Sequence, residues 1–300
     1  MRKLAEALRA MGQDRLLENE PMSRHTTFRV GGPADLMFLP ASAQELCDAL
    51  RLAREAGVPA QVLGNGSNLI VRDGGIRGLT IVLGEHFSDI RVEGKRLCAQ
   101  AGALLSRVAA AAMEAGLSGL EFAGGIPGTL GGGCAMNAGA YGGQISDVLV
   151  SAEVLLGGEV RTLSLEEMQM GYRTTLPLRE GGVVLSACFE LERDDSDAIQ
   201  SRMKELNARR RDKQPLNLPS AGSTFKRPEG HFAGALIEGC GLKGCAIGAA
   251  QVSQKHAGFI VNTGGATAKD ILQLIAHVQA VVRRETGVEL EPEVKIMGEG

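Results

Sequence analysis

The sequence has very few aromatic residues: it contains no tryptophan, two tyrosines and eight phenylalanines among 300 residues. Proteins that bind single-stranded nucleic acids commonly stack bases on aromatic side chains, so a surface of that kind is not expected here. The chain also lacks an excess of positive charge, since its formal net charge is −3, which argues against binding to a phosphate backbone. Both observations predict that the protein has no nucleic-acid partner.

Membrane and export signals are missing as well. No run approaches the roughly 18 consecutive apolar residues that indicate a membrane-spanning helix. The first residues, 1–6, lead into an amphipathic helix and include neither the apolar core nor the cleavage site of a signal peptide. We therefore expect a cytoplasmic protein without membrane insertion.

Patterns that bind metals are absent too. The six cysteines are scattered, and the one close pair, Cys240 and Cys245, lacks a second pair or a histidine at metal-binding spacing. The five histidines form no His-x-x-x-His pattern. We predict no metal site, and we expect the cysteines to be reduced, as is usual in a cytoplasmic protein.

Glycine, in contrast, is abundant, and nine glycines fall within residues 124–143. Each glycine inside a regular element costs about 0.5–1 kcal/mol relative to alanine, so this density needs a reason. A flexible linker would be polar and rich in serine, whereas this run includes Ile126, Leu130 and Met136. We favour backbone that lies against a large planar or phosphorylated ligand over a linker.

A second glycine motif, Gly-Asn-Gly-Ser-Asn at residues 64–68, begins like a dinucleotide-binding fingerprint. Its last position is Leu69, and the sequence at 70–75 predicts a strand and a turn, whereas a Rossmann site needs a helix that points at the pyrophosphate. No lysine follows at the spacing of a P-loop either. Two interpretations remain, a nest of N–H groups that holds an anion and an ordinary Asn-Gly hairpin turn.

The length of 300 residues predicts two or three domains, and the apolar pattern predicts a mixture of helices and strands. Two helix starts carry capping boxes, Ser42 with Glu45 and Thr267 with Asp270. Helices are expected at 42–57, 104–115, 194–213, 232–238 and 267–287, and strands at 35–39, 61–63, 69–71, 79–83, 90–92, 97–100, 148–156 and 183–192.

Taken together, the two glycine motifs closely resemble the UDP-N-acetylenolpyruvoylglucosamine reductase family. Further motifs follow the family order, and together they span nearly the whole chain. They are Thr26–Gly32, Tyr172-Arg173, Pro219–Pro228 and Leu290–Val294. The short passage from Arg173 to the motif at 219–228 is similar to the family's short type II form.

The resemblance implies an α+β fold with an FAD-binding unit of the PCMH or vanillyl-alcohol-oxidase type. That unit would consist of two subdomains at residues 1–84 and 85–200, followed by a C-terminal α+β substrate-binding domain at 201–300. No histidine or cysteine lies at an obvious position for covalent attachment, so we expect non-covalent FAD.

The implied activity is the NADPH-dependent reduction of UDP-N-acetylglucosamine enolpyruvate to UDP-N-acetylmuramate, a step of peptidoglycan precursor synthesis. No obligate protein partner is expected. By resemblance, the cofactor-binding residues are Gly64, Asn65, Gly66, Ser67, Asn68, Gly124, Gly125, Ile126, Pro127, Gly128, Thr129, Gly131, Asn137, Ala138 and Gly139.

The reaction itself requires particular side chains. Hydride addition to the enolpyruvyl group builds negative charge on the adjacent carbon and the carboxylate, so a cation and a proton donor are needed. The resemblance places Arg173 and Glu293 beside the carboxylate and makes Ser223 the proton donor. Arginine suits this role because its planar guanidinium can bind a carboxylate in two places. Substrate contacts are expected from Arg173, Lys213, Lys226 and His256.

Several alternatives stay open at this point. Glu291 competes with Glu293, and the basic run at 209–213 is also compatible with a solvated helix end. A sugar or alcohol oxidase that uses oxygen would share the fold, and a catalytically silent UDP-sugar-binding protein belongs to another class. The flavin colour of the purified protein and its NADPH consumption discriminate among these possibilities.

Overall fold

The computed structural model describes residues 1–300, which form two compact units. The first unit consists of residues 1–16, 38–65 and 80–210, and the second consists of residues 17–37, 66–79 and 211–300. The chain therefore passes from one unit to the other five times, and each unit is built from segments that are far apart in the sequence.

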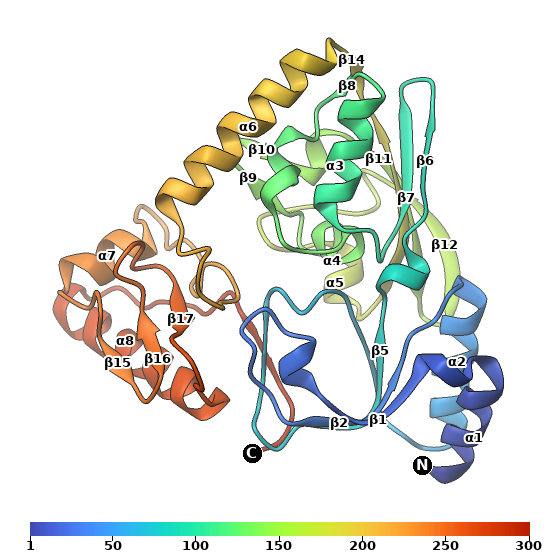
Figure 1. The fold of residues 1–300 in the computed structure, drawn as a ribbon, viewed down its shortest axis with the longest axis horizontal. Coiled ribbons are helices and arrows are strands. Elements are labelled where there is room, and N and C mark those ends of the chain that lie inside the picture. Colours follow the sequence, from blue (N-terminus) through green and yellow to red (C-terminus); the bar gives the residue numbers. More distant parts are fainter. The chain divides into compact units, whose positions relative to one another are not determined.

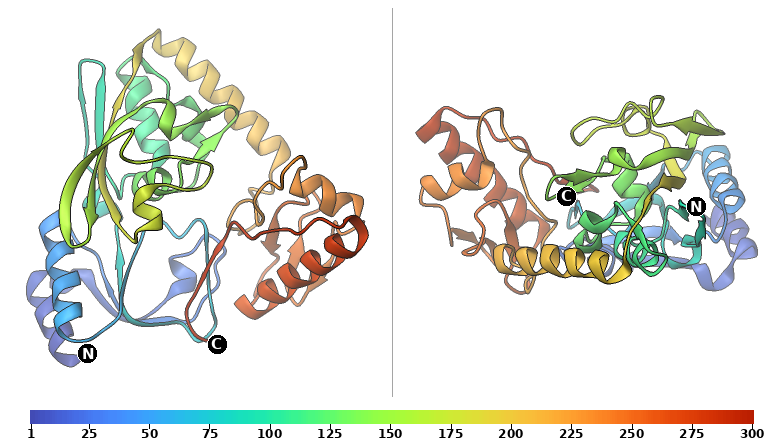
Figure 2. Two further views of the ribbon diagram at one scale, coloured as in Figure 1. Left: turned by 180° about the vertical axis from the view of Figure 1, so that it is seen from behind. Right: turned by 90° about the horizontal axis from the view of Figure 1, so that it is seen from above.

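A five-stranded antiparallel sheet forms the centre of the first unit, in the order β12-β11-β13-β7-β6 (Figure 1). Strand β7 alternates, because Leu97 and Ala99 are buried whereas Arg96 is exposed. The buried side chains pack with those of helices α3 and α4, such as Leu105 and Leu130, in one hydrophobic core. The helix α6 lies beside this core in both further views (Figure 2), and its Met203 packs against it.

Helices α1 and α2 also belong to the first unit. Ser42 caps α2 by accepting a hydrogen bond from the amide of Glu45 at 3.2 Å, which is one half of the expected capping box; the Glu45 carboxylate accepts from the amide of Ala41 at 2.8 Å. The carboxylate of Glu45 also accepts hydrogen bonds from Arg15, which holds α2 against the segment that follows α1. A four-stranded sheet has the order β1-β2-β5-β3, and three of its strands, β1, β2 and β5, continue from one unit into the other.

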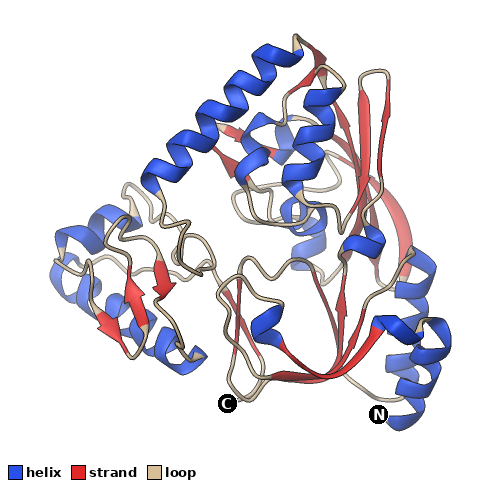
Figure 3. Cartoon of the chain, viewed as in Figure 1, coloured by secondary structure: helices blue, strands red, loops and turns tan.

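The second unit contains a three-stranded antiparallel sheet, β15-β16-β17, together with α7 and α8 (Figure 3). Thr267 and Asp270 form the expected capping box of α8, and Gly287 ends this helix with a φ of 73°, a value that favours glycine. Phe28 and Ile70, from the two early segments, are completely buried in the same core. The parallel pair β4 and β18 joins an early segment to the C-terminal one.

The helices have the following bounds: α1 Arg2–Met11, α2 Ala43–Glu55, α3 Leu105–Glu114, α4 Leu130–Ala135, α5 Leu176–Arg179, α6 Ser196–Lys213, α7 Ala233–Gly239 and α8 Ala268–Thr286. The strands are β1 Leu16–Pro21, β2 Pro33–Phe38, β3 Ala60–Leu63, β4 Leu69–Val71, β5 Ile76–Val82, β6 Ile90–Glu93, β7 Arg96–Gln100, β8 Leu117–Ser118, β9 Gly139–Ala140, β10 Gly143–Gln144, β11 Leu149–Leu156, β12 Glu159–Ser164, β13 Val183–Glu190, β14 Glu192–Arg193, β15 Ala246–Ile247, β16 Ala250–Val252, β17 Ile260–Asn262 and β18 Lys295–Met297.

The mixed α+β class is confirmed, and each helix and strand expected from the sequence is present within a few residues of its expected bounds. None of the helices is long and apolar enough to cross a lipid bilayer. No group of three or more histidine, cysteine or acidic side chains is arranged to hold a metal ion.

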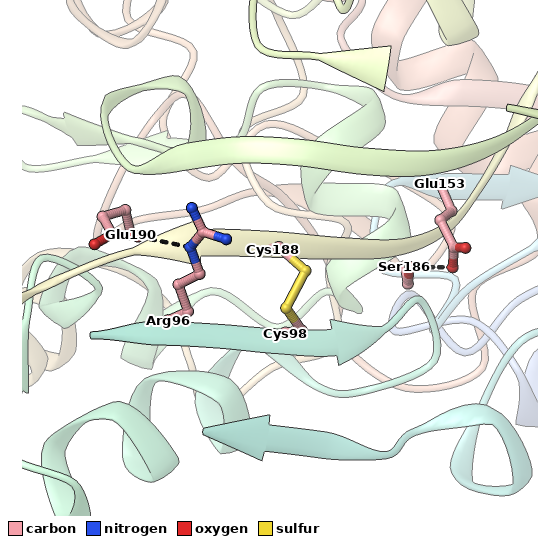
Figure 4. Close-up of a disulfide and its surroundings, with 6 residues drawn as sticks. All are labelled: Arg96, Cys98, Glu153, Ser186, Cys188 and Glu190. Atoms are coloured by element: carbon pink, nitrogen blue, oxygen red, sulfur yellow. Dashed lines mark hydrogen bonds and ion pairs between the residues drawn. A yellow bond between two sulfur atoms is a disulfide. The ribbon is translucent and has the colours of Figure 1, made fainter. Parts of the chain in front are cut away.

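One expectation about cysteine is wrong. Cys98 on β7 and Cys188 on β13 lie directly opposite each other and form a disulfide (Figure 4). The same face of the sheet carries an ion pair between Arg96 and Glu190. The two cysteines are 90 residues apart in the sequence, so their spacing gives no sign of this pairing. The other four cysteines are free thiols.

Candidate functional site

In the second unit, the Ser223 loop runs alongside the segment that carries Glu293. Phe225 and Pro292 form an antiparallel bridge, and the amide of Glu293 donates a hydrogen bond to the carbonyl of Thr224 at 2.8 Å. Two residues that are 70 positions apart in the sequence are thereby held on neighbouring stretches of backbone. The structure therefore places the Ser223 loop and the Glu293 segment side by side.

The backbone of the Ser223 loop is fixed by its neighbour, Thr224. This threonine is completely buried; its amide donates to the carbonyl of Gly258 at 2.9 Å, and its hydroxyl accepts from the amide of Ile260 at 3.1 Å. The Ser223 side chain is exposed and makes no hydrogen bond within the protein. Its hydroxyl is therefore held on a rigid loop and is available to a ligand.

The environments of Glu291 and Glu293 distinguish the two candidate carboxylates. Glu291 forms an ion pair with Lys226 and its side chain is 70% exposed. Glu293 is half-buried, and its carbonyl accepts a hydrogen bond from the side-chain amide of Asn68 at 3.1 Å. Because Asn68 belongs to the second glycine motif, this contact joins the motif to the Glu293 segment, while the difference in burial and the ion pair of Glu291 separate the two carboxylates.

The glycines of the motif at 64–68 are required by the protein's own backbone. A Cβ on Gly66, whose φ is +60°, would lie 2.0 Å from the carbonyl oxygen of His25, and a Cβ on Gly64 would lie 2.2 Å from the hydroxyl of Thr129. The side chain of Asn65 donates to the carbonyl of Pro127 at 2.7 Å. This hydrogen bond ties the motif to the first glycine-rich segment, so the two glycine motifs of the sequence are neighbours in the fold.

The glycine-rich run at 124–143 is also packed tightly against its surroundings. Residues 130–135 form the short helix α4 rather than a loop, and a Cβ on Gly131 would lie 2.8 Å from the Cβ of Ala101. Gly142, with a φ of +90°, has nothing within 4 Å of such a Cβ. Close internal packing explains part of this glycine content, while positions such as Gly142 leave bare backbone next to open space.

Arg173 has an unusual backbone conformation. It is the third residue of a turn closed by the bridge between Gly171 and Thr174, and its φ is +57°. A residue with a Cβ pays about 1–3 kcal/mol for such a conformation, which persists only where the surroundings impose it and is concentrated at functional sites. Its guanidinium lies 5.2 Å from the ring centre of Tyr172. This turn belongs to the first unit, whereas Ser223 and Glu293 belong to the second.

Arg210 on α6 is a candidate that the sequence analysis missed. Its side chain packs against Gly125, where a Cβ would lie 3.1 Å from the Cδ of Arg210. Burial lowers the pKa of its guanidinium, and no hydrogen bond or ion pair within the protein compensates for that burial. Its spacing from Met203 and Asn207, which also face the glycine pair at 124–125, is the helical signal that could have identified it.

The two weaker candidates differ in their surroundings. The Nδ1 atom of His256 accepts a hydrogen bond from the amide of Gly258 at 3.1 Å, and Gly258 also binds the backbone of the Ser223 loop. Burial lowers the pKa of His256, so its ring is neutral near pH 7. Lys213 is the last residue of α6 and is exposed. The structure thus places His256 near Ser223 and leaves Lys213 at a solvated helix end.

Within the first unit, Gly125 lies beside the partly buried guanidinium of Arg210, and Asn65 is hydrogen-bonded to Pro127 of the same glycine-rich segment. A cation beside bare backbone is an arrangement that suits a negatively charged group such as the diphosphate of a flavin dinucleotide. The side chain of Asn137 is already hydrogen-bonded inside the protein and is 4% exposed, so any contact of this residue with a cofactor would come from its backbone.

Comparisons with known proteins agree with this arrangement. Residues 34–164 match the family model of an FAD binding domain, and residues 214–297 match that of the UDP-N-acetylenolpyruvoylglucosamine reductase C-terminal domain. UDP-N-acetylenolpyruvoylglucosamine reductase of Clostridium botulinum strain Hall is 51% identical over 290 residues, covering 96% of this chain and 94% of the relative. The corresponding Pediococcus pentosaceus protein is also 51% identical, with 97% of both chains covered.

Solved structures show the same relationship. The crystal structure of UDP-N-acetylenolpyruvylglucosamine reductase from Thermus caldophilus matches with a TM-score of 0.80 and 38% identity, covering 94% of this chain and 97% of that one. Alkyldihydroxyacetonephosphate synthase shares the fold over 64% of this chain, at 18% identity and a TM-score of 0.50. The resemblance and the FAD-binding fold expected from the sequence are confirmed.

Proposed function

Because the chain belongs to the UDP-N-acetylenolpyruvoylglucosamine reductase family, we propose that it converts UDP-N-acetylglucosamine enolpyruvate to UDP-N-acetylmuramate. FAD is its cofactor, NADPH is its hydride donor, and the product is a peptidoglycan precursor. The cytoplasm, where nucleotide sugars and NADPH are available, is its site of action. The pairing of the Ser223 loop with the Glu293 segment carries this proposal, since it holds the backbone beside an exposed hydroxyl next to the backbone of a half-buried glutamate.

FAD, when bound, supplies the hydride-transfer chemistry of the reaction. The residues that would hold it non-covalently are those of the two glycine motifs, at 64–68 and 124–131, together with the backbone of residues 137–139. Arg210 adds a cation at Gly125 for a negatively charged part of the cofactor or the substrate. In functional terms, residues 1–84 and 85–200 hold the cofactor and residues 201–300 bind the UDP-sugar, with contacts from Lys213, Lys226 and His256.

The roles of the catalytic residues follow from the charge that develops on the substrate. Reduction of the enolpyruvyl group leaves negative charge on the carbon that bears the carboxylate, and the guanidinium of Arg173 binds that carboxylate and stabilises the charge, with Glu293 beside it. The guanidinium of Arg173 offers two parallel N–H donors. The hydroxyl of Ser223 then transfers its proton to the carbon, which completes the saturated lactyl ether.

The test separates the two half-reactions in a stopped-flow experiment. Flavin reduction by NADPH needs no acid at Ser223, so Ser223→Ala should bleach at the wild-type rate. Reoxidation by the enolpyruvyl sugar should be about 10²–10⁴-fold slower, because general acid catalysis contributes that factor. Ser223→Cys, which restores a proton donor, should recover part of the rate.

Two results would contradict the proposal. Wild-type reoxidation in Ser223→Ala would show that the proton comes from another group. A protein purified without a flavin spectrum, or one whose NADPH consumption does not depend on the enolpyruvyl sugar, would remove the assigned activity as a whole.

A further inference from the structure

The turn that carries Arg173 is tied to the glycine-rich segment by two buried side chains. The hydroxyl of Thr175 donates to the carbonyl of Ala135 at 2.7 Å, and the side-chain amide of Asn137 donates to the carbonyl of Gly171 at 3.4 Å. Both side chains lie in the same unit as Arg173. The left-handed conformation of Arg173 is thus enclosed between a tie before it, at Gly171, and a tie after it, at Thr175.

Asparagine is well suited to its place in this arrangement. Asn137 itself has a φ of +44°, and asparagine tolerates this region better than other residues with a Cβ. Its side-chain oxygen accepts from the amide of Ser146 at 3.0 Å. Its amide nitrogen donates to the hydroxyl of Ser146 at 3.2 Å and, at 3.4 Å each, to the side chain of Gln144 and the carbonyl of Gly171. Because the side chain is 4% exposed and its donor and acceptor atoms are engaged within the protein, it has little capacity left for a ligand.

Thr175 is equally constrained. It is completely buried, and besides donating to Ala135 its hydroxyl caps helix α5 by accepting from the amide of Leu178 in the first turn. The hydroxyl therefore connects three pieces of chain: the segment before Asn137, the Arg173 turn and the helix that follows it. A valine in its place would keep the shape and lose these connections.

We infer that Asn137 and Thr175 are positioning residues that hold Arg173 in its productive conformation. The inference rests on the proposed role of Arg173 as the carboxylate-binding cation. It assigns the Asn137 side chain to the Arg173 turn rather than to the cofactor. Loss of either tie should allow the turn to relax to an ordinary conformation and to move the guanidinium away from the substrate carboxylate.

The experiment compares Asn137→Asp and Thr175→Val with two controls. Asn137→Asp keeps the acceptor for Ser146 and loses the donor to Gly171, whereas the control Thr175→Ser keeps the hydroxyl. The control Ser146→Ala removes a partner of Asn137 that does not belong to the Arg173 turn. In each variant we would measure FAD affinity by flavin fluorescence on titration of the apoprotein, flavin reduction by NADPH and reoxidation by the enolpyruvyl sugar.

We expect both test variants to bind FAD and to react with NADPH as the wild type does, and to be reoxidised at least tenfold more slowly. Both controls should stay within about threefold of the wild type. In an Arg173→Lys background, the same two substitutions should slow reoxidation much less, because the effects of residues that act through one group are not additive.

The outcomes separate this inference from the proposed function. A loss of FAD affinity with normal reoxidation, or equal effects in both backgrounds, would overturn the positioning role. Wild-type reoxidation in Arg173→Lys itself would instead remove Arg173 from the mechanism. If Thr175→Val does not fold, the milder Asn137→Asp still decides the matter.

Discussion

At the scale of single residues, the structure separates two glutamates that the sequence leaves as competitors. We predict that Glu293→Gln slows reoxidation by the enolpyruvyl sugar at least tenfold, because Glu293 is half-buried and its backbone is hydrogen-bonded to the Ser223 loop. Glu291→Gln should change this rate less than threefold, since an exposed ion pair such as that with Lys226 contributes little. The reoxidation rates of both variants are measured by stopped flow. A larger loss of rate in Glu291→Gln than in Glu293→Gln would assign the catalytic role to Glu291.

His256 gives a prediction about pH. Its pKa is lowered in the folded protein by burial, so the unfolded chain binds a proton more readily than the folded one. The contribution of His256 to the free energy of unfolding should therefore be fully present above the ordinary histidine pKa of about 6.5, and it should be lost as the pH drops below that value. His256→Asn, which can still accept from Gly258, should lose less stability than the wild type between pH 7.5 and pH 5.5 in urea titrations. If the free energy of unfolding depends on pH identically in both proteins, protonation of His256 does not contribute to the pH dependence of stability.

The glycines show how far reasoning from single residues extends. The sequence leaves the motif at 64–68 as either an anion-holding nest or a hairpin turn, and the structure shows that neither Gly64 nor Gly66 has room for a Cβ. It also supplies a reason that the sequence does not contain, because the atoms that exclude a Cβ belong to Thr129 and His25. Such contacts join residues more than 35 positions apart, so neither composition nor spacing reveals them.

At the scale of elements, local patterns predict helices and strands well where the pattern itself determines the structure. The capping boxes of α2 and α8 mark the first residues of both helices correctly. Helix α4 was not predicted, since its Leu-Gly-Gly-Gly-Cys-Ala sequence has a low helix propensity. It is held by tertiary contacts, in which the amides of Leu130 and Gly131 donate to the carbonyls of Ala103 and Ala101. The exposed edge strand β12 was missed because it lacks an apolar alternation.

The disulfide between β7 and β13 yields a prediction for the five-stranded sheet. Linking residues 90 positions apart restricts the unfolded chain by on the order of 4–5 kcal/mol in the chain-entropy treatment, and native disulfides typically contribute about 2–4 kcal/mol. We expect dithiothreitol to lower the free energy of unfolding by this smaller amount. A Cys98→Ala, Cys188→Ala double variant should unfold identically with and without the reductant.

The same experiment has a structural readout. Strand β7 leads directly into Ala101, whose carbonyl binds the amide of Gly131 in α4, so reduction should also increase hydrogen exchange at that amide. If dithiothreitol changes neither the unfolding free energy of the wild type nor this exchange rate, the cross-link is not a structural element of the protein in solution.

At the scale of the whole molecule, the sequence predicts three consecutive parts, whereas the compact units are assembled from discontinuous segments. The reason lies in the sheets. Strand β18 near the C-terminus pairs in parallel with β4 at residues 69–71, and Phe28 and Ile70 complete a core that consists mostly of residues beyond 220. Pairings over more than 200 residues leave no local pattern in the sequence. Only the family resemblance could bring the Ser223 and Glu293 motifs together in advance.

This organisation predicts that the C-terminal part does not fold alone. A fragment of residues 211–300 lacks Phe28, Val30 and Ile70, which are 0–3% exposed in the intact core, and it also lacks the strand that pairs with β18. Burying three such side chains contributes about 1.5–3 kcal/mol each, which is comparable with the entire stability of a small domain, about 5–15 kcal/mol. The isolated fragment should therefore show poorly dispersed amide resonances and no cooperative urea transition, while the full chain shows both dispersion and cooperativity. A well-dispersed spectrum with a sharp transition would instead establish that the early segments only cover a core that the last 90 residues can build themselves.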